Sequence, residues 1–420
     1  MLLLLSSWAF SSGQQDGAVK KSLSVWLQSH FSKKSSEMIR DRFLKFGQEN
    51  NVGVSVELFD YSDGRARWAV VIESGVSPDI GLMEYDDLGR LAEQGVLLDQ
   101  SDNFGMVQKE NGNLYPSLKS TVTFGGKQWG LPLFLETDVL YYRRDRLADS
   151  GYGGAPETWD RLREIAAKTT DAAYGVFGAG IGFGRKNRDG QLFLRSLVWG
   201  YGGSLVDAAG KNVAIYSPGT VQAYEWVRQV IVVDRSTPPG SVHWDDEGND
   251  KSFLSGQACM IINGGSILDR LINEDAELLR QTDISPVPSG PRGRFLCGRS
   301  SALGIFRDTG VPDLSERMIR YLLSKDWYAR WMDTGAPIFA PVYTNLDGRT
   351  VWDDPLKKPI VKSSEFAFFL GYPAEYTRRA GEAYERHIFS DAAERLVLDH
   401  IKAEEAVAEL EAAAREIFGH

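Results

Sequence analysis

Two carboxylates separated by one residue, Glu136 and Asp138, lie in the middle of an apolar segment that spans residues 130–144. In an extended strand, residues two apart point to the same face. Both acids would therefore share one side of a largely buried strand, which is costly unless polar groups meet them. We expect this segment to cross between two lobes with its acids facing a cleft. An ordinary core strand with the acids at a frayed end is the alternative.

Paired carboxylates could also hydrolyse a glycoside, where a general acid and a nucleophile flank the bond that breaks. Acids two apart on one strand lie side by side instead of on opposite sides of a bond. The sequence contains no Gly-x-Ser-x-Gly elbow and no His-Glu-x-x-His motif, and its 5 histidines are scattered. We predict no catalytic residue, and a secreted glycoside-acting enzyme is the alternative function.

No group of residues has the spacing of a metal or cofactor site. Cys259 and Cys297 match neither a zinc nor a redox motif, and we expect buried free thiols, with a disulfide as the alternative. The glycine run at residues 178–184 lacks the Gly-Lys-Ser/Thr ending of a phosphate loop and the third glycine of a dinucleotide fingerprint. We predict no cofactor and no metal, and interpret the run as a loop at the edge of a cleft.

The bulk composition favours a protein of two domains or lobes. The chain has 420 residues, of which 43% are hydrophobic, enough for substantial cores. Its net charge is −10, from 47 basic and 57 acidic residues, and no basic stripe is present. Nucleic-acid binding is therefore not expected.

The first 13 residues form an apolar run followed by small and polar residues. This pattern is typical of the hydrophobic part of a secretory signal, here without its positive first region, and the run is too short to span a bilayer. We predict a signal-like segment at residues 1–19 and a secreted, soluble, periplasmic mature protein.

The first part of the chain alternates predicted strands and helices, at residues 22–28, 34–50, 52–59, 65–73, 79–83 and 87–93. This alternation predicts an α/β lobe with a parallel sheet. Ligands of such sheets sit beyond the carboxyl ends of the strands. Polar or aromatic residues follow each strand, at residues 28–30, 60–61 and 84–86.

Beyond the crossover segment, the spacing predicts helices and strands of a second lobe. We expect helices at residues 158–168, 191–199, 217–233 and 403–418, and strands at 174–177, 256–263, 284–288 and 295–306. The last of these strands could cross back to the first lobe.

The order of several short motifs resembles the extracellular solute-binding proteins of sugar ABC importers, the maltose-binding-protein-like family. The matching pieces lie at residues 74–79, 91–97, 129–142, 202–205, 217–218 and 253–264. This resemblance implies two α/β lobes of the periplasmic binding protein fold, each a mixed sheet flanked by helices, joined by hinge crossovers. It also implies a carbohydrate ligand, an ABC transporter permease as partner and a monomer.

The resemblance also implies lobe boundaries. The first lobe would comprise residues 20–135 plus 305–345, and the second lobe residues 136–304 plus 346–420. Hinge closure over a ligand is the motion typical of periplasmic binding proteins.

By position in this resemblance, we expect ligand contacts at Gln28, His30, Asp86, Glu136, Gly264, Gly265, Ser266, Gly298 and Arg299. By chemistry alone, we add the acid Asp138, and the aromatic residues Tyr85, Trp199, Tyr201 and Tyr372, because sugar faces stack on aromatic rings. Tyr61 is added because it follows the second predicted strand. For Trp199 and Tyr372 we favour packing in the core over stacking on a sugar, because large aromatic side chains are mostly buried.

Three positions depart from the family's pattern, and one of them is Asp138, where related members frequently carry another residue type. Ser266 stands where members often carry tryptophan, so a long oligosaccharide would lack one stacking platform. Arg299 stands where a small residue is expected, and its planar guanidinium could bind an anionic substituent of a sugar. The alternative for Arg299 is a salt bridge on the surface or between the lobes.

Overall fold

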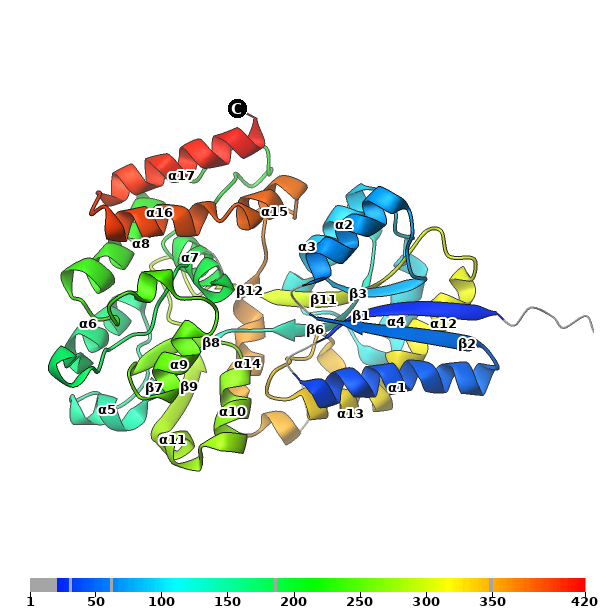
Figure 1. The fold of residues 1–420 in the computed structure, drawn as a ribbon, viewed down its shortest axis with the longest axis horizontal. Coiled ribbons are helices and arrows are strands. Elements are labelled where there is room, and N and C mark those ends of the chain that lie inside the picture. The colour runs from blue at the N-terminus through cyan, green and yellow to red at the C-terminus, as the bar shows by residue number, and fades with distance from the viewer. Residues whose placement is uncertain (1–20, 30–31, 61–62, 185–186, 347–349, 420) are drawn as a thin grey trace, which may run out of the picture.

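The structure is a computed structural model that describes residues 21–29, 32–60, 63–184, 187–346 and 350–419. The predicted signal-like segment and two predicted ligand-binding residues, His30 and Tyr61, lie outside the described residues. The described chain forms two lobes, which lie side by side along the long axis of Figure 1.

The first lobe is built on a five-stranded sheet in the order β2-β1-β3-β11-β6. Its strands are β1 (Ser22–Gln28), β2 (Gly53–Phe59), β3 (Ile80–Glu84), β6 (Leu131–Glu136) and β11 (Arg299–Ile305). Strand β1 pairs in parallel with β2 and β3, whereas β11 runs antiparallel to β3 and β6. The predicted parallel sheet is therefore confirmed for its first three strands. The antiparallel strand β11 and the edge strand β6, which runs in the same direction as the first three, complete the sheet.

Helices cover both faces of this sheet (Figure 1). They are α1 (Lys33–Asn50), α2 (Gly64–Ser74), α3 (Tyr85–Glu93), α4 (Ser101–Asn111), α12 (Pro312–Leu322) and α13 (Lys325–Gly335). Helix α1 illustrates the local rules. The Ser32 side chain caps its first turn, Ile39, Phe43 and Phe46 recur on its buried face, and Asn51 ends it in a left-handed conformation.

The second lobe contains a three-stranded antiparallel sheet in the order β8-β7-β9. Its strands are β7 (Val139–Arg143), β8 (Met260–Asn263) and β9 (Thr282–Pro286). Parallel bridges from Phe177 to Ala258 and from Gly180 to Ile261 extend the pairing beyond β8. The strand predicted at residues 174–177 is wrong, because a short 3-10 turn at Ala172–Tyr174 and isolated bridges take its place.

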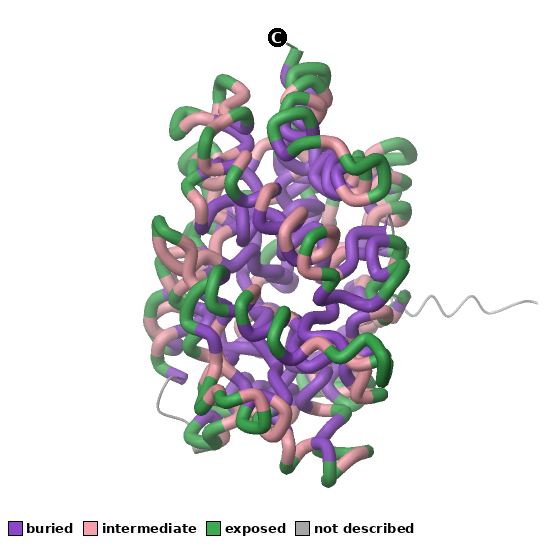
Figure 2. The backbone as a smooth tube through the Cα atoms, turned by 90° about the vertical axis from the view of Figure 1, so that its left-hand side faces the viewer, coloured by how far each residue is buried: buried purple, intermediate pink, exposed green. Residues whose placement is uncertain are grey.

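Helices surround the second sheet. They are α5 (Arg144–Asp149), α6 (Trp159–Thr169), α7 (Arg188–Gly200), α8 (Pro218–Arg228), α9 (Gly248–Leu254), α10 (Ser266–Glu274), α11 (Ala276–Gln281), α15 (Arg378–Glu385), α16 (Ile388–Leu398) and α17 (Ala403–Phe418). Thr158 and Ser217 cap α6 and α8 with their side chains. Figure 2, which faces this lobe, shows buried backbone inside and exposed turns on the rim.

The apolar segment at residues 130–144 crosses between the lobes, as expected, but as two strands. Strand β6 belongs to the first sheet and β7 to the second, with Thr137 and Asp138 between them. These two residues belong to neither strand, so the chain leaves its extended pairing at the crossover.

Two further connections complete the junction. Strand β10 (Leu296–Cys297) pairs with β12 (Ala367–Phe368), and β11 follows β10 directly. Helix α14 (Lys358–Ser363) lies between the lobes in Figure 1. The pairing of β11 places residues 299–304 in the first sheet, in contrast to the boundary expected at residue 305.

Both cysteines are buried and free in the structure. Cys259 lies in the core of the second lobe and Cys297 in the core that continues across the junction. Among the described residues, none of the helices combines the length and apolar character that a bilayer crossing requires.

Candidate ligand-binding site

One buried arginine gathers three carboxylates where the two lobes meet. The guanidinium of Arg299 donates from Nε to Glu136 at 3.0 Å, from Nη2 to Asp138 at 2.8 Å and from Nη1 to Asp189 at 3.3 Å. We call these four residues the Arg299 cluster. The two acids predicted to share a face therefore converge on one guanidinium. The ion pairs of this guanidinium form the salt bridge between the lobes that was named as the alternative for Arg299.

Backbone pairing brings the cluster together. Arg299 begins β11 and lies directly opposite Glu136, the last residue of β6, in the antiparallel register. Asp138 follows in the crossover, and Asp189 comes from the first turn of α7 in the second lobe. The cluster thus joins two first-lobe strands, a connecting segment and a second-lobe helix.

The cluster holds one cation for three acids, and burial makes the ionised forms of these acids less favourable. Burial raises the pKa of Glu136 and of Asp138, and the neighbouring Arg299 lowers each in part. Burial, followed by the charge of Asp138, raises the pKa of Asp189 well above its usual range. Hydroxyl groups that donate hydrogen bonds to these carboxylates would offset the loss of water around them.

A second ion pair joins the lobes close by. Glu84, the last residue of β3, accepts a hydrogen bond at 2.7 Å from Nη2 of Arg188, the first residue of α7. Both side chains are largely buried, at 17% and 18% exposure. Glu84 lies opposite Ser301 on β11, two positions from Arg299, so the pair borders the Arg299 cluster.

Replacing Arg188 with methionine is expected to lower the stability of the protein by about 1–3 kcal/mol, because Glu84 would stay largely buried without its cation. A double variant, Glu84→Gln with Arg188→Met, should recover part of that loss. Thermal melts of the three proteins measure both effects. A double variant as unstable as the single one would contradict the pairing as the cause.

The predicted loop at residues 264–266 lies beside the cluster. A side chain at Gly264 would place its Cβ 3.2 Å from Nη2 of Arg299, and the Gly264 carbonyl accepts a hydrogen bond from Tyr141. Gly265 approaches the first lobe most closely, since a Cβ there would lie 2.0 Å from the Pro337 carbonyl oxygen. Ser266 is the first residue of α10.

Three predicted residues lie at the carboxyl ends of first-lobe strands. Gln28 ends β1 and is buried. Asp86 forms a 2.6 Å ion pair with Arg65. The ring of Tyr85 is buried against Phe369, and its hydroxyl accepts a hydrogen bond from a backbone N–H, so it offers no stacking face in this structure.

The other predicted aromatic residues lie away from the Arg299 cluster. Trp199 and Tyr201 are at the opposite end of α7 from Asp189, a separation of about 15–18 Å at 1.5 Å per residue. Trp199 packs edge-on against Tyr372 with ring centroids 5.3 Å apart, in line with the packing favoured for both from the sequence. The Tyr201 hydroxyl donates to Asp160.

Gly298 lies immediately before Arg299, and its contacts with neighbouring residues give it a structural role. Its N–H donates to the Phe368 carbonyl at 2.9 Å, and a Cβ there would touch Ala367 and Phe369 at 3.3 Å. This close packing fixes the start of β11 and hence the direction of the Arg299 side chain.

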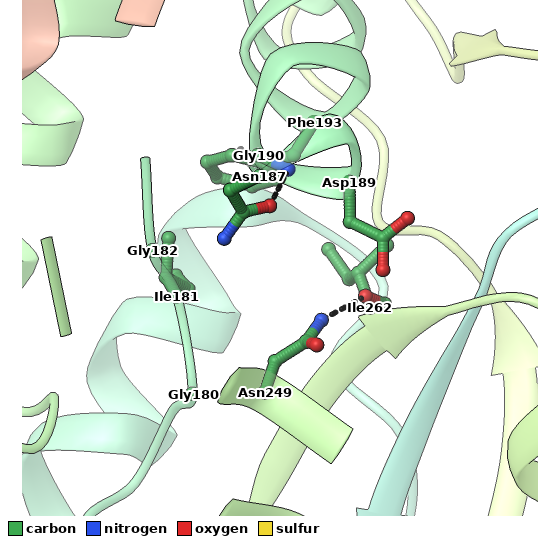
Figure 3. Close-up of a pocket in the computed structure, with 9 residues that line it drawn as sticks. All are labelled: Gly180, Ile181, Gly182, Asn187, Asp189, Gly190, Phe193, Asn249 and Ile262. Carbon is green, nitrogen blue, oxygen red and sulfur yellow. Dashed lines mark hydrogen bonds between the residues drawn. The ribbon is translucent and has the colours of Figure 1, made fainter. Parts of the chain in front are cut away.

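A small pocket lies on the second-lobe side of the cluster (Figure 3). Residues of the predicted glycine-rich loop, Gly180 to Gly182, form one wall, and Asn187, Asp189 and Asn249 contribute polar groups. Sequence reasoning placed none of these three polar residues in the site. The available signal was the Asn-Arg-Asp-Gly start of α7, where Asn187 caps the helix through the Gly190 N–H.

Asp250 on α9 lies next to this pocket, and its raised pKa makes the stability of the protein depend on pH. Burial raises the pKa of Asp250 to about 6, so the folded protein holds its proton more tightly than the unfolded chain does. The resulting stability is present below the ordinary pKa of about 4 and is lost as pH rises through about 6.

We therefore expect the stability of Asp250→Asn, measured relative to wild type, to be greater at pH 7.5 than at pH 4. The difference between the two pH values should be about 1–3 kcal/mol, because one pKa unit corresponds to about 1.4 kcal/mol. The asparagine oxygen can still accept the hydrogen bond that Asn263 donates to Asp250. Denaturation of both proteins at the two pH values measures this, with the exposed Asp149→Asn as control. An equal difference at both pH values would argue against it.

The sequence matches a known protein family. Residues 27–329 match the family described as bacterial extracellular solute-binding protein. The maltodextrin-binding protein MdxE of Bacillus subtilis (strain 168) is 26% identical over 337 residues, which cover 75% of this chain and 72% of that protein.

Solved structures share the fold. A solute-binding protein from Thermotoga lettingae TMO, bound with alpha-D-tagatose, superposes with a TM-score of 0.78 at 18% identity, covering 95% of this chain and 100% of that chain. Maltose-bound T. maritima MalE3 gives 0.77 at 21% identity, covering 94% and 99%. The family match spans most of the chain, and the two-lobed fold agrees with it: the protein belongs to the bacterial extracellular solute-binding protein family.

Proposed function

We propose that this protein captures a small sugar or sugar derivative between its two lobes and delivers it to the permease of an ABC transporter. The observation that carries the proposal is the meeting of polar side chains from both lobes at one junction. Glu84 and Arg299 come from the first sheet, and Arg188 and Asp189 from the second lobe. Sugar hydroxyls require such donors and acceptors.

The contacts of Arg299 favour an uncharged sugar over the anionic derivative considered from the sequence. Each of the three guanidinium nitrogens already donates to a carboxylate, and the cluster keeps more acids than cations. An anionic ligand would have to displace one of these acids and then lie among the remaining ones, which Coulomb repulsion disfavours.

The arrangement of the acids supports binding over glycoside hydrolysis. A retaining or inverting hydrolase needs two carboxyl groups on opposite sides of the bond that breaks. Here Glu136 and Asp138 converge on the same guanidinium from one crossover segment. We propose accordingly that the protein acts as a receptor outside the cytoplasmic membrane, as a monomer and without cofactor.

Calorimetry against a panel of sugars tests the proposal. D-glucose, D-galactose, maltose, maltotriose and D-glucuronate cover neutral, oligomeric and acidic ligands. We expect saturable binding of at least one neutral sugar and weaker binding of glucuronate. No binding across the panel, together with turnover of a nitrophenyl glycoside, would favour the hydrolase.

A further inference from the structure

The second lobe contains a larger pocket that takes no part in the proposed sugar site. Its volume is about 490 Å³, within the range of pockets that hold small organic ligands. It shares no lining residue with the Arg299 cluster or with the pocket of Figure 3. In Figure 1, α16 starts next to α15 and ends at the side of the second lobe that faces away from the first, and its last residues line this pocket. We call it the outer pocket.

The wall of the outer pocket is largely apolar. Its apolar side chains include Phe177, Ile231, Val232, Val242, Val397 and Leu398. A π-helix at Gln229–Val233 follows α8 directly and supplies two of them. Such wide turns are frequent at functional sites. Leu398 is 47% exposed, so part of this wall is open to solvent. Covering it with a hydrocarbon group is favourable, by about 25 cal/mol per Å².

Arg235 adds a positive charge to this wall. Its side chain is exposed and forms no ion pair or hydrogen bond within the part of the chain that the structure describes. Two histidines, His243 and His400, also line the outer pocket, whereas no aspartate or glutamate is among its described lining residues. The acids next to the lining residues include three that are bound to other basic groups, in the pairs Asp234–Arg163, Asp399–Arg395 and Glu394–His243.

A carboxylate on a hydrocarbon body fits this combination of groups. A guanidinium donates two parallel N–H groups to a carboxylate, and the apolar wall covers the hydrocarbon body. A sugar would leave hydroxyl groups against carbon without partners, and Arg235 would repel an amine.

We propose that the outer pocket binds a small monocarboxylic acid in its anionic form. The carboxylate accepts hydrogen bonds from Arg235, and the hydrocarbon body lies against the π-helix and the end of α16. This site is separate from the sugar site, and its ligand does not compete with the sugar.

Methyl NMR of the full chain at pH 7.5 locates the binding. Octanoate is the probe, and its carboxyl group is ionised at this pH. We expect saturable shifts of the methyl signals of Ile231, Val232 and Leu398, with Ile181 and Ile262 at the pocket of Figure 3 unshifted. Octan-1-ol and octylamine, the uncharged and cationic counterparts, should bind at least about fivefold more weakly, because neither accepts a charge-assisted hydrogen bond from Arg235.

Arg235→Met tests the role of the charge. We expect Kd for octanoate to rise about 5–50-fold and Kd for octan-1-ol to stay within about threefold of wild type. Arg235→Lys keeps the charge without the planar fork and should lie between the two. Arg307→Met, at an exposed position of the first lobe, is the control for the change in net charge. Should Arg235→Met prove unstable, Arg235→Asn replaces it, because asparagine readily adopts the positive φ of 51° found here.

Several outcomes would overturn the proposal. They are the absence of saturable shifts with octanoate, shifts confined to Ile181 and Ile262, equal affinity for octanoate and octan-1-ol, and unchanged octanoate affinity in the folded Arg235 variants. None of them affects the proposed sugar receptor. Conversely, a protein that binds octanoate as expected but no panel sugar would contradict the proposed function and leave this inference standing.

Discussion

Replacing Arg299 with methionine is expected to destabilise the protein by about 3–5 kcal/mol at pH 7.5, because three buried carboxylates would lose their shared cation. The side chain of Arg299 is only 11% exposed, so water cannot take its place. Methionine preserves much of the packing volume, and the loss is therefore electrostatic.

The pH dependence distinguishes this effect from a packing defect. Glu136, Asp138 and Asp189 have raised pKa values in the folded protein because of burial. Without Arg299 they would bind protons more readily still, so the difference from wild type should shrink as pH falls from 7.5 to 4.5. Denaturant titrations at both pH values measure it.

Arg161→Met is the matched control for this variant. Its side chain is 46% exposed and pairs with Glu164 on the surface, and such pairs contribute about 0–1 kcal/mol. A loss for Arg299→Met no larger than for Arg161→Met, or one that does not change with pH, would show that the cluster is not held by its charge.

Gly265→Ala is expected to weaken sugar binding while each lobe stays folded. An added Cβ would lie 2.0 Å from the Pro337 carbonyl oxygen, 2.6 Å from its carbonyl carbon and 3.0 Å from the Ile338 Cα. These are backbone atoms, which cannot rotate away. Gly265 has φ of −66°, a conformation that alanine adopts without strain, so the clash lies between the lobes and not within α10.

The lobes must therefore separate locally in Gly265→Ala. Overpacking of this kind costs about 1–3 kcal/mol. If the ligand binds the arrangement in which the lobes touch, that cost appears as a rise of about 5–150-fold in Kd. Calorimetry measures the affinity, and small-angle X-ray scattering should report a larger radius of gyration.

Gly105→Ala on α4 is the control, because an added Cβ there meets no atom within 4 Å. We expect this variant to keep the affinity of wild type. Unchanged affinity and dimensions in Gly265→Ala would mean that the contact with Pro337 plays no part in binding.

Several elements of this protein could be predicted because near neighbours determine them. Thr158 and Ser217 cap their helices through N–H groups three residues ahead, and the apolar spacing of residues 403–418 gives α17 with those same bounds. The acids of residues 130–144 likewise required a polar partner, and Arg299 supplies it at the crossover between the two lobes.

Which residues form the site depends on contacts between distant parts of the chain, and sequence spacing does not encode these contacts. Asp189 lies 110 residues from Arg299 along the chain and meets it only because α7 docks against the start of β11. Tyr85, Trp199 and Tyr372 have the right residue type for sugar stacking, yet Tyr85 and Trp199 are buried against other aromatic rings and the half-buried Tyr372 packs against Trp199. Local sequence determines caps, periodicity and the crossover, whereas the docking of two lobes decides which polar groups face one another.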